Sequence, residues 1–99
     1  MPLGMGSSTT KYVTADSVIG PSGGRIRVFQ ATWLASAGAD SLVLRNGTTD
    51  SDTIWITAAG TASKTTTVNF GKEGIVFSSG CFVDIGSSTS VNVTYRVEL

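Results

Sequence analysis

Histidine is absent from this chain of 99 residues, and cysteine occurs once, as Cys81. A single cysteine cannot form an intrachain disulfide, and the missing histidine removes the commonest general base and metal ligand. Charge is also scarce, because 14% of the residues are Asp, Glu, Lys or Arg, against about 25% in an average soluble domain. These absences disfavour an enzyme, and we expect no catalytic residue, no metal, no cofactor and no small-molecule substrate.

The charged residues that are present give no sign of a nucleic-acid or membrane partner. Seven acidic and seven basic residues cancel to a net charge of zero, whereas nucleic-acid binding needs a basic stripe. Only Arg25 and Arg27 are close in sequence, and they are expected to share a strand face that is solvated or contacts another subunit. Residues 1–6 contain neither a basic region nor an apolar run, so we expect no secretion signal and no membrane anchor. The chain is therefore expected to be made in the cytoplasm.

Alternation of apolar and polar residues dominates the chain and is unbroken over residues 91–99. This period of two predicts a strand with one buried face, and no helical pattern competes with it. About eight strand candidates are separated by Gly-rich and polar breaks: 11–19, 25–34, 41–45, 52–57, 64–70, 74–78, 81–85 and 91–99. We predict an all-β protein, an antiparallel β-sandwich of about eight strands that is jelly-roll-like, with Greek-key or meander connections as the alternative.

The domain organisation follows from the same pattern. Residues 11–99 are expected to form a single β-sandwich domain, because the chain has no room for a second core. Residues 1–10 are rich in Gly, Ser and Thr and have little to bury, which predicts a flexible N-terminal arm. The arm is either a loose tail or a segment that orders against a neighbouring subunit.

Several local patterns are informative. The apolar phase of segment 25–34 changes near Phe29, which indicates either a β-bulge or a strand buried on both sides. Asn46-Gly47 is a strong hairpin signal after the inward-facing Leu42 and Leu44. Asp50 and Asp52 follow it, and two acids are too few to predict a calcium site, which leaves a polar hairpin loop.

The alternation along the strands predicts which way two aromatic residues and the cysteine face. Cys81 alternates with Val83 and Ile85 and is expected to be a small buried hydrophobic residue. Phe82 is out of phase with these residues, and Trp55 is out of phase with Ile54 and Ile56, which are expected to face inward. Both rings are therefore expected to face outward. The sequence leaves open whether they contact a subunit, pack under a loop or stack on a sugar.

Four segments carry a resemblance to a known group of proteins: Lys11-Tyr12-Val13-Thr14-Ala15, Arg25-Ile26-Arg27-Val28-Phe29, Ser41-Leu42-Val43-Leu44-Arg45-Asn46-Gly47 and Glu73-Gly74-Ile75-Val76-Phe77-Ser78-Ser79-Gly80-Cys81-Phe82-Val83. Together with the alternating last strand, they resemble the small all-β virion structural proteins of tailed bacteriophages, especially phages of cyanobacteria. The match covers residues 11–99.

The resemblance implies a non-enzymatic structural role in the virion. Such proteins are capsid cement or decoration proteins that are commonly trimeric and bind the major capsid protein. Trp55, Phe82, Arg25, Arg27 and Arg96 are then the expected subunit or capsid interface residues. A small tail, adaptor or fibre component of the virion is one alternative, and a carbohydrate-binding β-sandwich module is another.

Overall fold

The structure is a computed structural model that describes residues 8–20, 24–38, 41–86, 88 and 90–98. These ranges contain no helix, and therefore none that is long and apolar enough to cross a membrane. They contain nine strands: β1 (Thr9–Val13), β2 (Ser17–Ile19), β3 (Arg25–Leu34), β4 (Leu42–Asn46), β5 (Thr53–Ala58), β6 (Thr65–Asn69), β7 (Ile75–Phe77), β8 (Cys81–Asp84) and β9 (Ser90–Glu98).

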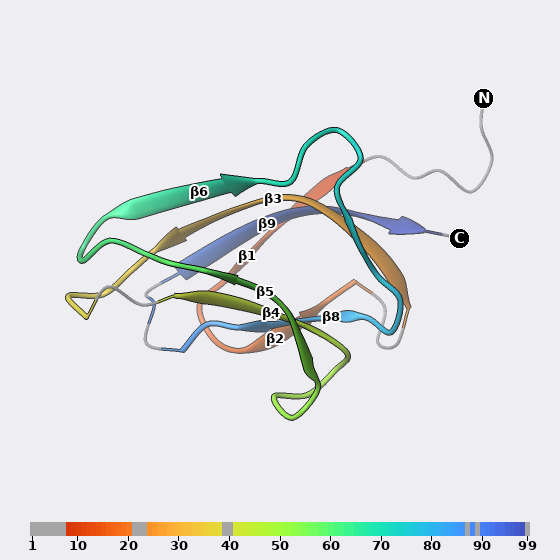
Figure 1. Cartoon of the computed structure of the whole chain (residues 1–99), viewed down its shortest axis with the longest axis horizontal. Coiled ribbons are helices and arrows are strands. Elements are labelled where there is room, and N and C mark those ends of the chain that lie inside the picture. The colour runs from red at the N-terminus through yellow and green to blue at the C-terminus, as the bar shows by residue number, and fades with distance from the viewer. Residues whose placement is uncertain (1–7, 21–23, 39–40, 87, 89, 99) are drawn as a thin grey trace.

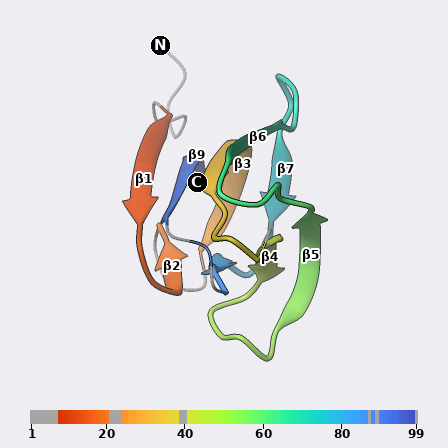
Figure 2. The same cartoon turned by 90° about the vertical axis from the view of Figure 1, so that its left-hand side faces the viewer.

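The strands form two antiparallel sheets that pack face to face (Figure 1). Sheet A has the order β1-β9-β3, and β6 and β7 both pair with the far side of β3. Sheet B has the order β2-β8-β4-β5. Figure 2 shows β1 and β2 at one edge of the molecule and β5, β6 and β7 at the opposite edge.

The strand pairs are nested, as in one long hairpin that is folded over on itself. Strand β4 pairs with β5, β3 with β6 and β7, β2 with β8, and β1 with β9. Distributing such nested pairs between two sheets produces the jelly roll, in which β6 and β7 together take the place of one strand. The prediction of an all-β, jelly-roll-like sandwich is confirmed.

Apolar side chains from both sheets fill the space between them. Alternate residues of β9 and β4 lie in this core, as the period of two predicts, and Leu42, Leu44 and Cys81 are buried there as expected. Burying each aliphatic or aromatic side chain contributes about 1.5–3 kcal/mol. The largest fully buried side chains are Trp33, Phe77, Ile19, Ile26, Leu42, Leu44, Val28, Val83, Val91, Val93 and Cys81.

A β-bulge in β3 keeps one face of this long strand on the core. Ile26 and Val28 are buried before the bulge, and Ala31 and Trp33 are buried after it. The register against β9 shifts between Val28 and Gln30, so Phe29 is the extra residue. Of the two interpretations of the phase change, the bulge is confirmed.

The prediction of one strand over residues 11–19 is wrong. Val13 pairs with Val91 in sheet A, and Ser17 pairs with Val83 in sheet B. Between them the chain crosses from one sheet to the other, where an Asp16 Oδ1 atom accepts a hydrogen bond from the backbone N–H of Ile85 at 2.8 Å. An apolar alternation does not reveal this crossing, because both strands contribute inward-facing residues.

Strand β1 also begins earlier than the sequence indicated. Thr9 and Thr10, assigned to the flexible arm, belong to β1 and pair with Tyr95 and Thr94. The rest of the predicted arm that precedes Ser8 lies outside the described residues.

Candidate functional site

Trp55 lies on the edge strand β5 and bridges the two sheets. Its indole Nε1–H donates a hydrogen bond to the backbone carbonyl of Val76 in β7 at 3.0 Å. Its ring contacts the ring of Phe77, with centroids 6.4 Å apart. The side chain nevertheless remains 46% exposed. Trp55 is therefore only partly outward-facing, as about half of its side chain packs against the opposite sheet.

The expectation that Ile54 faces inward is wrong. Ile54 is 50% exposed, whereas Ile56 is half-buried against the core. The register between β4 and β5 pairs Leu44 with Ile56 and Arg45 with Ile54, which leaves Trp55 as an extra residue. This second bulge reverses the phase of β5, so Ile54 lies beside Arg45 on the outer face of sheet B.

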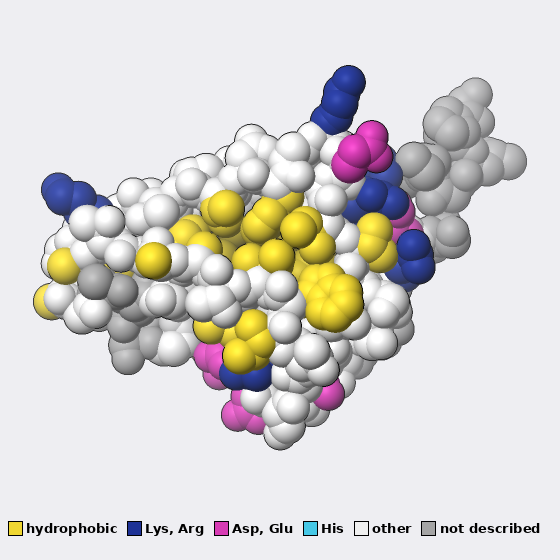
Figure 3. All heavy atoms as spheres, in the orientation of Figure 1, with side chains coloured by type: hydrophobic (Ala, Val, Ile, Leu, Met, Phe, Trp, Pro, Cys, Tyr) yellow, Lys and Arg dark blue, Asp and Glu magenta, His cyan; other side chains and the backbone are white. Residues whose placement is uncertain are grey.

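The edge of the sandwich at β5, β6 and β7 is open, and apolar side chains lie partly exposed along it. We call this surface the open seam. Figure 3 shows hydrophobic side chains gathered between β5 and β6, with charged side chains away from their centre. The seam consists of the exposed Trp55 and of five half-buried residues that pack against the core: Ile56, Ala58, Val68, Phe70 and Ile75.

Phe82 belongs to a different surface. It lies on β8, opposite Val18 of β2 and Arg45 of β4, and it is half-buried on the outer face of sheet B. Strand β4 separates β8 from β5, and the Trp55 ring packs on Phe77 instead. The structure thus places Phe82 outward as expected but does not bring it together with Trp55 in one aromatic platform.

The three predicted interface arginines share the outer face of sheet A. Arg27 and Arg96 lie opposite each other on β3 and β9, and both bind Glu98, with N–O distances of 2.8 and 3.1 Å. Arg25 lies beside them and is exposed. The hydrogen bond from Arg27, followed by the contact with Arg96, lowers the pKa of the Glu98 carboxyl.

Contacts within the chain hold Arg27 and Arg96 further. Arg27 donates to the backbone carbonyl of Glu73 at 2.6 Å, and the Arg96 guanidinium lies 5.4 Å from the centroid of the Phe29 ring. The two arginines are thus fixed in place, and Arg25 is the member of the set whose charge is most open to a partner.

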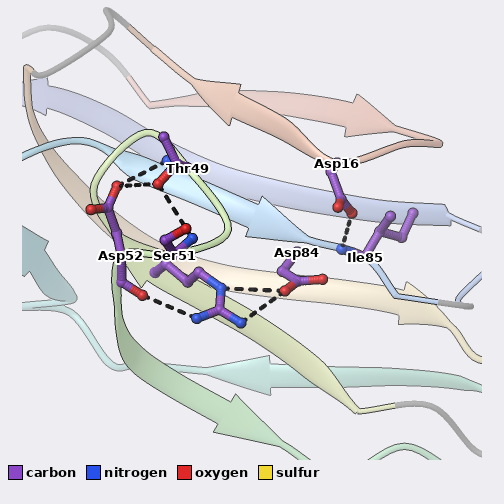
Figure 4. A network of polar contacts seen from close by, with 7 residues as sticks. Asp16, Thr49, Ser51, Asp52, Asp84 and Ile85 are labelled. Carbon is purple, nitrogen blue, oxygen red and sulfur yellow. Dashed lines mark hydrogen bonds and ion pairs between the residues drawn. The ribbon is translucent and has the colours of Figure 1, made fainter.

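A polar network organises the loop between β4 and β5 (Figure 4). Asp52 Oδ2 accepts hydrogen bonds from the backbone N–H groups of Thr48 and Thr49 at 2.8 and 2.9 Å, and from the Thr49 hydroxyl at 3.0 Å. These bonds, with the two backbone N–H groups first, lower the pKa of Asp52. A Cβ atom at Gly47 would overlap this carboxylate. The Asp52 carboxylate therefore serves as the internal cap of a polar hairpin loop.

Arg45 links this loop to sheet B. Its Nε and Nη2 atoms donate to Asp84 at 3.2 and 3.0 Å, and its Nη1 atom donates to the backbone carbonyl of Asp52 at 3.0 Å. The described ranges contain no group of three or more Cys, Asp or Glu side chains placed to hold a metal ion. They also enclose no pocket.

Cys81 lies in the core on β8, where burial raises the pKa of its thiol to about 12. A thiol with this pKa is protonated at neutral pH and is a poor nucleophile. Its position agrees with the prediction of a small buried residue.

No family model, curated protein or solved structure matches this chain. The fold and the surfaces described above are therefore the observations from which a function can be argued. Of the surfaces, the open seam is the one that the sequence did not indicate. The sequence feature that could have indicated the seam is the stretch from residue 53 to 63, which contains no charged residue and no proline.

Proposed function

We propose that this chain is a non-enzymatic structural protein of a tailed-phage virion, a capsid cement or decoration protein that self-associates as a trimer and binds the major capsid protein. The sequence resemblance over residues 11–99 suggests the class of protein. The single structural observation that supports it best is the open seam, an uncharged apolar surface at the edge of a small sandwich. Contiguous apolar patches on a soluble domain commonly mark interaction sites.

The surfaces of the molecule suit two different contacts. The open seam is apolar and suits burial against a sister subunit, because interface centres are depleted in charge and enriched in aromatic residues. The outer face of sheet A carries three arginines and one glutamate and suits polar anchoring to a shell. Many weak contacts of this kind add up when each copy is held in a lattice.

The arginine surface provides a test of shell attachment. Arg25→Ala is expected to weaken binding to capsids that lack this protein by up to about five-fold, because an exposed ion pair contributes about 0.2–1 kcal/mol. The measurement is co-sedimentation of the purified chain with such capsids at two salt concentrations, and attachment is expected to fall at the higher one.

Lys64→Ala is the matched control, because Lys64 is an exposed basic residue in the connection between β5 and β6. Equal loss of binding in both variants would point to non-specific charge attraction. Absence of binding by the wild-type chain would contradict the proposed attachment to the shell.

A further inference from the structure

Strand β5 is the longest edge strand in the described part of the sandwich. Natural sheets guard their edges with short strands, lysines or prolines, because unpaired backbone N–H and C=O groups invite another chain. The other edge strands follow this rule: β1 contains Lys11, β2 and β7 have three residues each, and β6 directly follows Lys64. Strand β5 has six residues, none of which is charged or proline, and its bulge at Trp55 is the one protective feature that it carries.

Charge distinguishes the open seam from the outer face of sheet A and from the loops beside sheet B. The outer face of sheet A has an excess of arginine, and the loops beside sheet B carry Asp16, Asp50 and Asp52. Two identical copies that meet through either region bring like charges together. The seam residues carry no charge at all, so two copies can meet there without repulsion. This neutrality favours a second copy of the chain over a charged partner.

The seam has the size of the apolar centre of a contact between subunits. Strand β5 extends over about 20 Å, and packed sheets lie about 10 Å apart, so the apolar strip between the two sheets covers roughly 200 Å². A standard interface buries about 800 Å² on each partner. An uncharged polar rim for the remaining area is provided by exposed threonines of β5 and β6: Thr53, Thr57, Thr65 and Thr67.

The geometry points to the open seam as the surface through which one copy of the chain binds the seam of another. In the proposed trimer, the three seams face the three-fold axis, and Trp55 and Phe70 lie in the contact. This inference rests on the proposed self-association and names the surface that carries it. The arginine face of sheet A then stays free for the shell.

The two tryptophans of the wild-type chain permit a test without mutation. Trp33 is 1% exposed and Trp55 is 46% exposed, so acrylamide quenching of fluorescence reports on Trp55. Over a concentration series, light scattering behind a sizing column gives the mass of the particle. Quenching is expected to fall in step with the change from monomer to oligomer, because the seam becomes covered.

Ala58 provides the matched variants. Ala58→Lys places a charge in the seam and is expected to give a folded monomer, while Ala15→Lys, in the exposed connection between β1 and β2, is expected to assemble like the wild type. Ala58→Glu alone is expected to be monomeric too. Mixing the Ala58→Lys and Ala58→Glu chains is expected to restore assembly in part, because two of the three contacts at the axis then join opposite charges while the third joins like charges.

The outcomes separate this inference from the proposed function. An oligomer whose Trp55 is quenched as in the monomer, or that survives Ala58→Lys, overturns the seam contact and leaves self-association in place. A wild-type chain that is monomeric at every concentration overturns both. If Ala58→Lys does not fold, as judged by circular dichroism, the quenching series on the wild-type chain decides alone.

Discussion

The contacts that Trp55 makes between the two sheets contribute to the free energy of unfolding, and the size of this contribution can be calculated and measured. Its hydrogen bond to the Val76 carbonyl contributes about 0.5–1 kcal/mol, at the low end of the usual range because the site is half open to water. About half of the side chain is buried, which corresponds to roughly 100 Å² of ring surface. At about 25 cal/mol per Å², this burial contributes about 2.5 kcal/mol.

Two substitutions separate these contributions. Trp55→Phe removes the hydrogen bond but keeps a ring against Phe77, and it is expected to lower the free energy of unfolding by about 1 kcal/mol. Trp55→Ala removes both and is expected to cost about 3 kcal/mol. In a domain of this size each kcal/mol lowers the melting temperature by about 4–8 °C.

The assay is urea or thermal unfolding followed by far-UV circular dichroism. It is made at a protein concentration where the monomer predominates, because oligomerisation itself raises apparent stability. A Trp55→Phe variant as stable as the wild type would refute a contribution from the Val76 hydrogen bond. A Trp55→Ala variant no less stable than Trp55→Phe would refute the packing argument.

Two further predictions concern titratable groups. Because the folded-state pKa of Glu98 is lowered, its ion pairs stabilise the fold above the pKa of an unfolded glutamate, and this stability is lost as the pH falls through the lowered folded pKa. At pH 7 the wild type is expected to exceed Glu98→Gln in free energy of unfolding by on the order of 1 kcal/mol, and this difference should disappear in acid. Denaturation at several pH values measures the difference. A difference that does not change with pH would contradict the prediction. Burial raises the pKa of the Cys81 thiol from 9.0 to about 12. Its alkylation by iodoacetamide at pH 8 should therefore be roughly a thousandfold slower in the folded chain than in denaturant. Similar alkylation rates in the two states would contradict the burial of Cys81.

Much of the fold could be predicted from alternation alone, and the reasons for the errors are physical. Strand β3 is where the sequence placed it, and the bulge at Phe29 was visible because a phase change in a long apolar strand has few other causes. The bulge at Trp55 was not visible, because Ile54, Trp55 and Ile56 are all apolar, and an uninterrupted alternation fits such a run as well as a bulge does. As a consequence, Ile54 was placed in the core although it is exposed.

The surfaces were less predictable than the strands, because they depend on which strands become neighbours. Residue spacing placed Phe82 on an outer face and missed the packing of Trp55 on the opposite sheet, and only the strand order shows that the two rings belong to separate surfaces. Likewise, the contacts of Arg27 and Arg96 with Glu98 join residues distant in sequence. The interface roles proposed for these residues stay predictions.

The most direct test of the proposed role is to count the copies of this chain in phage particles purified from cells that produce it, by quantitative mass spectrometry against the major capsid protein. A cement or decoration protein is expected in fixed proportion to the capsid subunits. A few copies per particle would instead indicate a tail, adaptor or fibre component. Absence of the chain from purified particles would contradict a structural role in the virion.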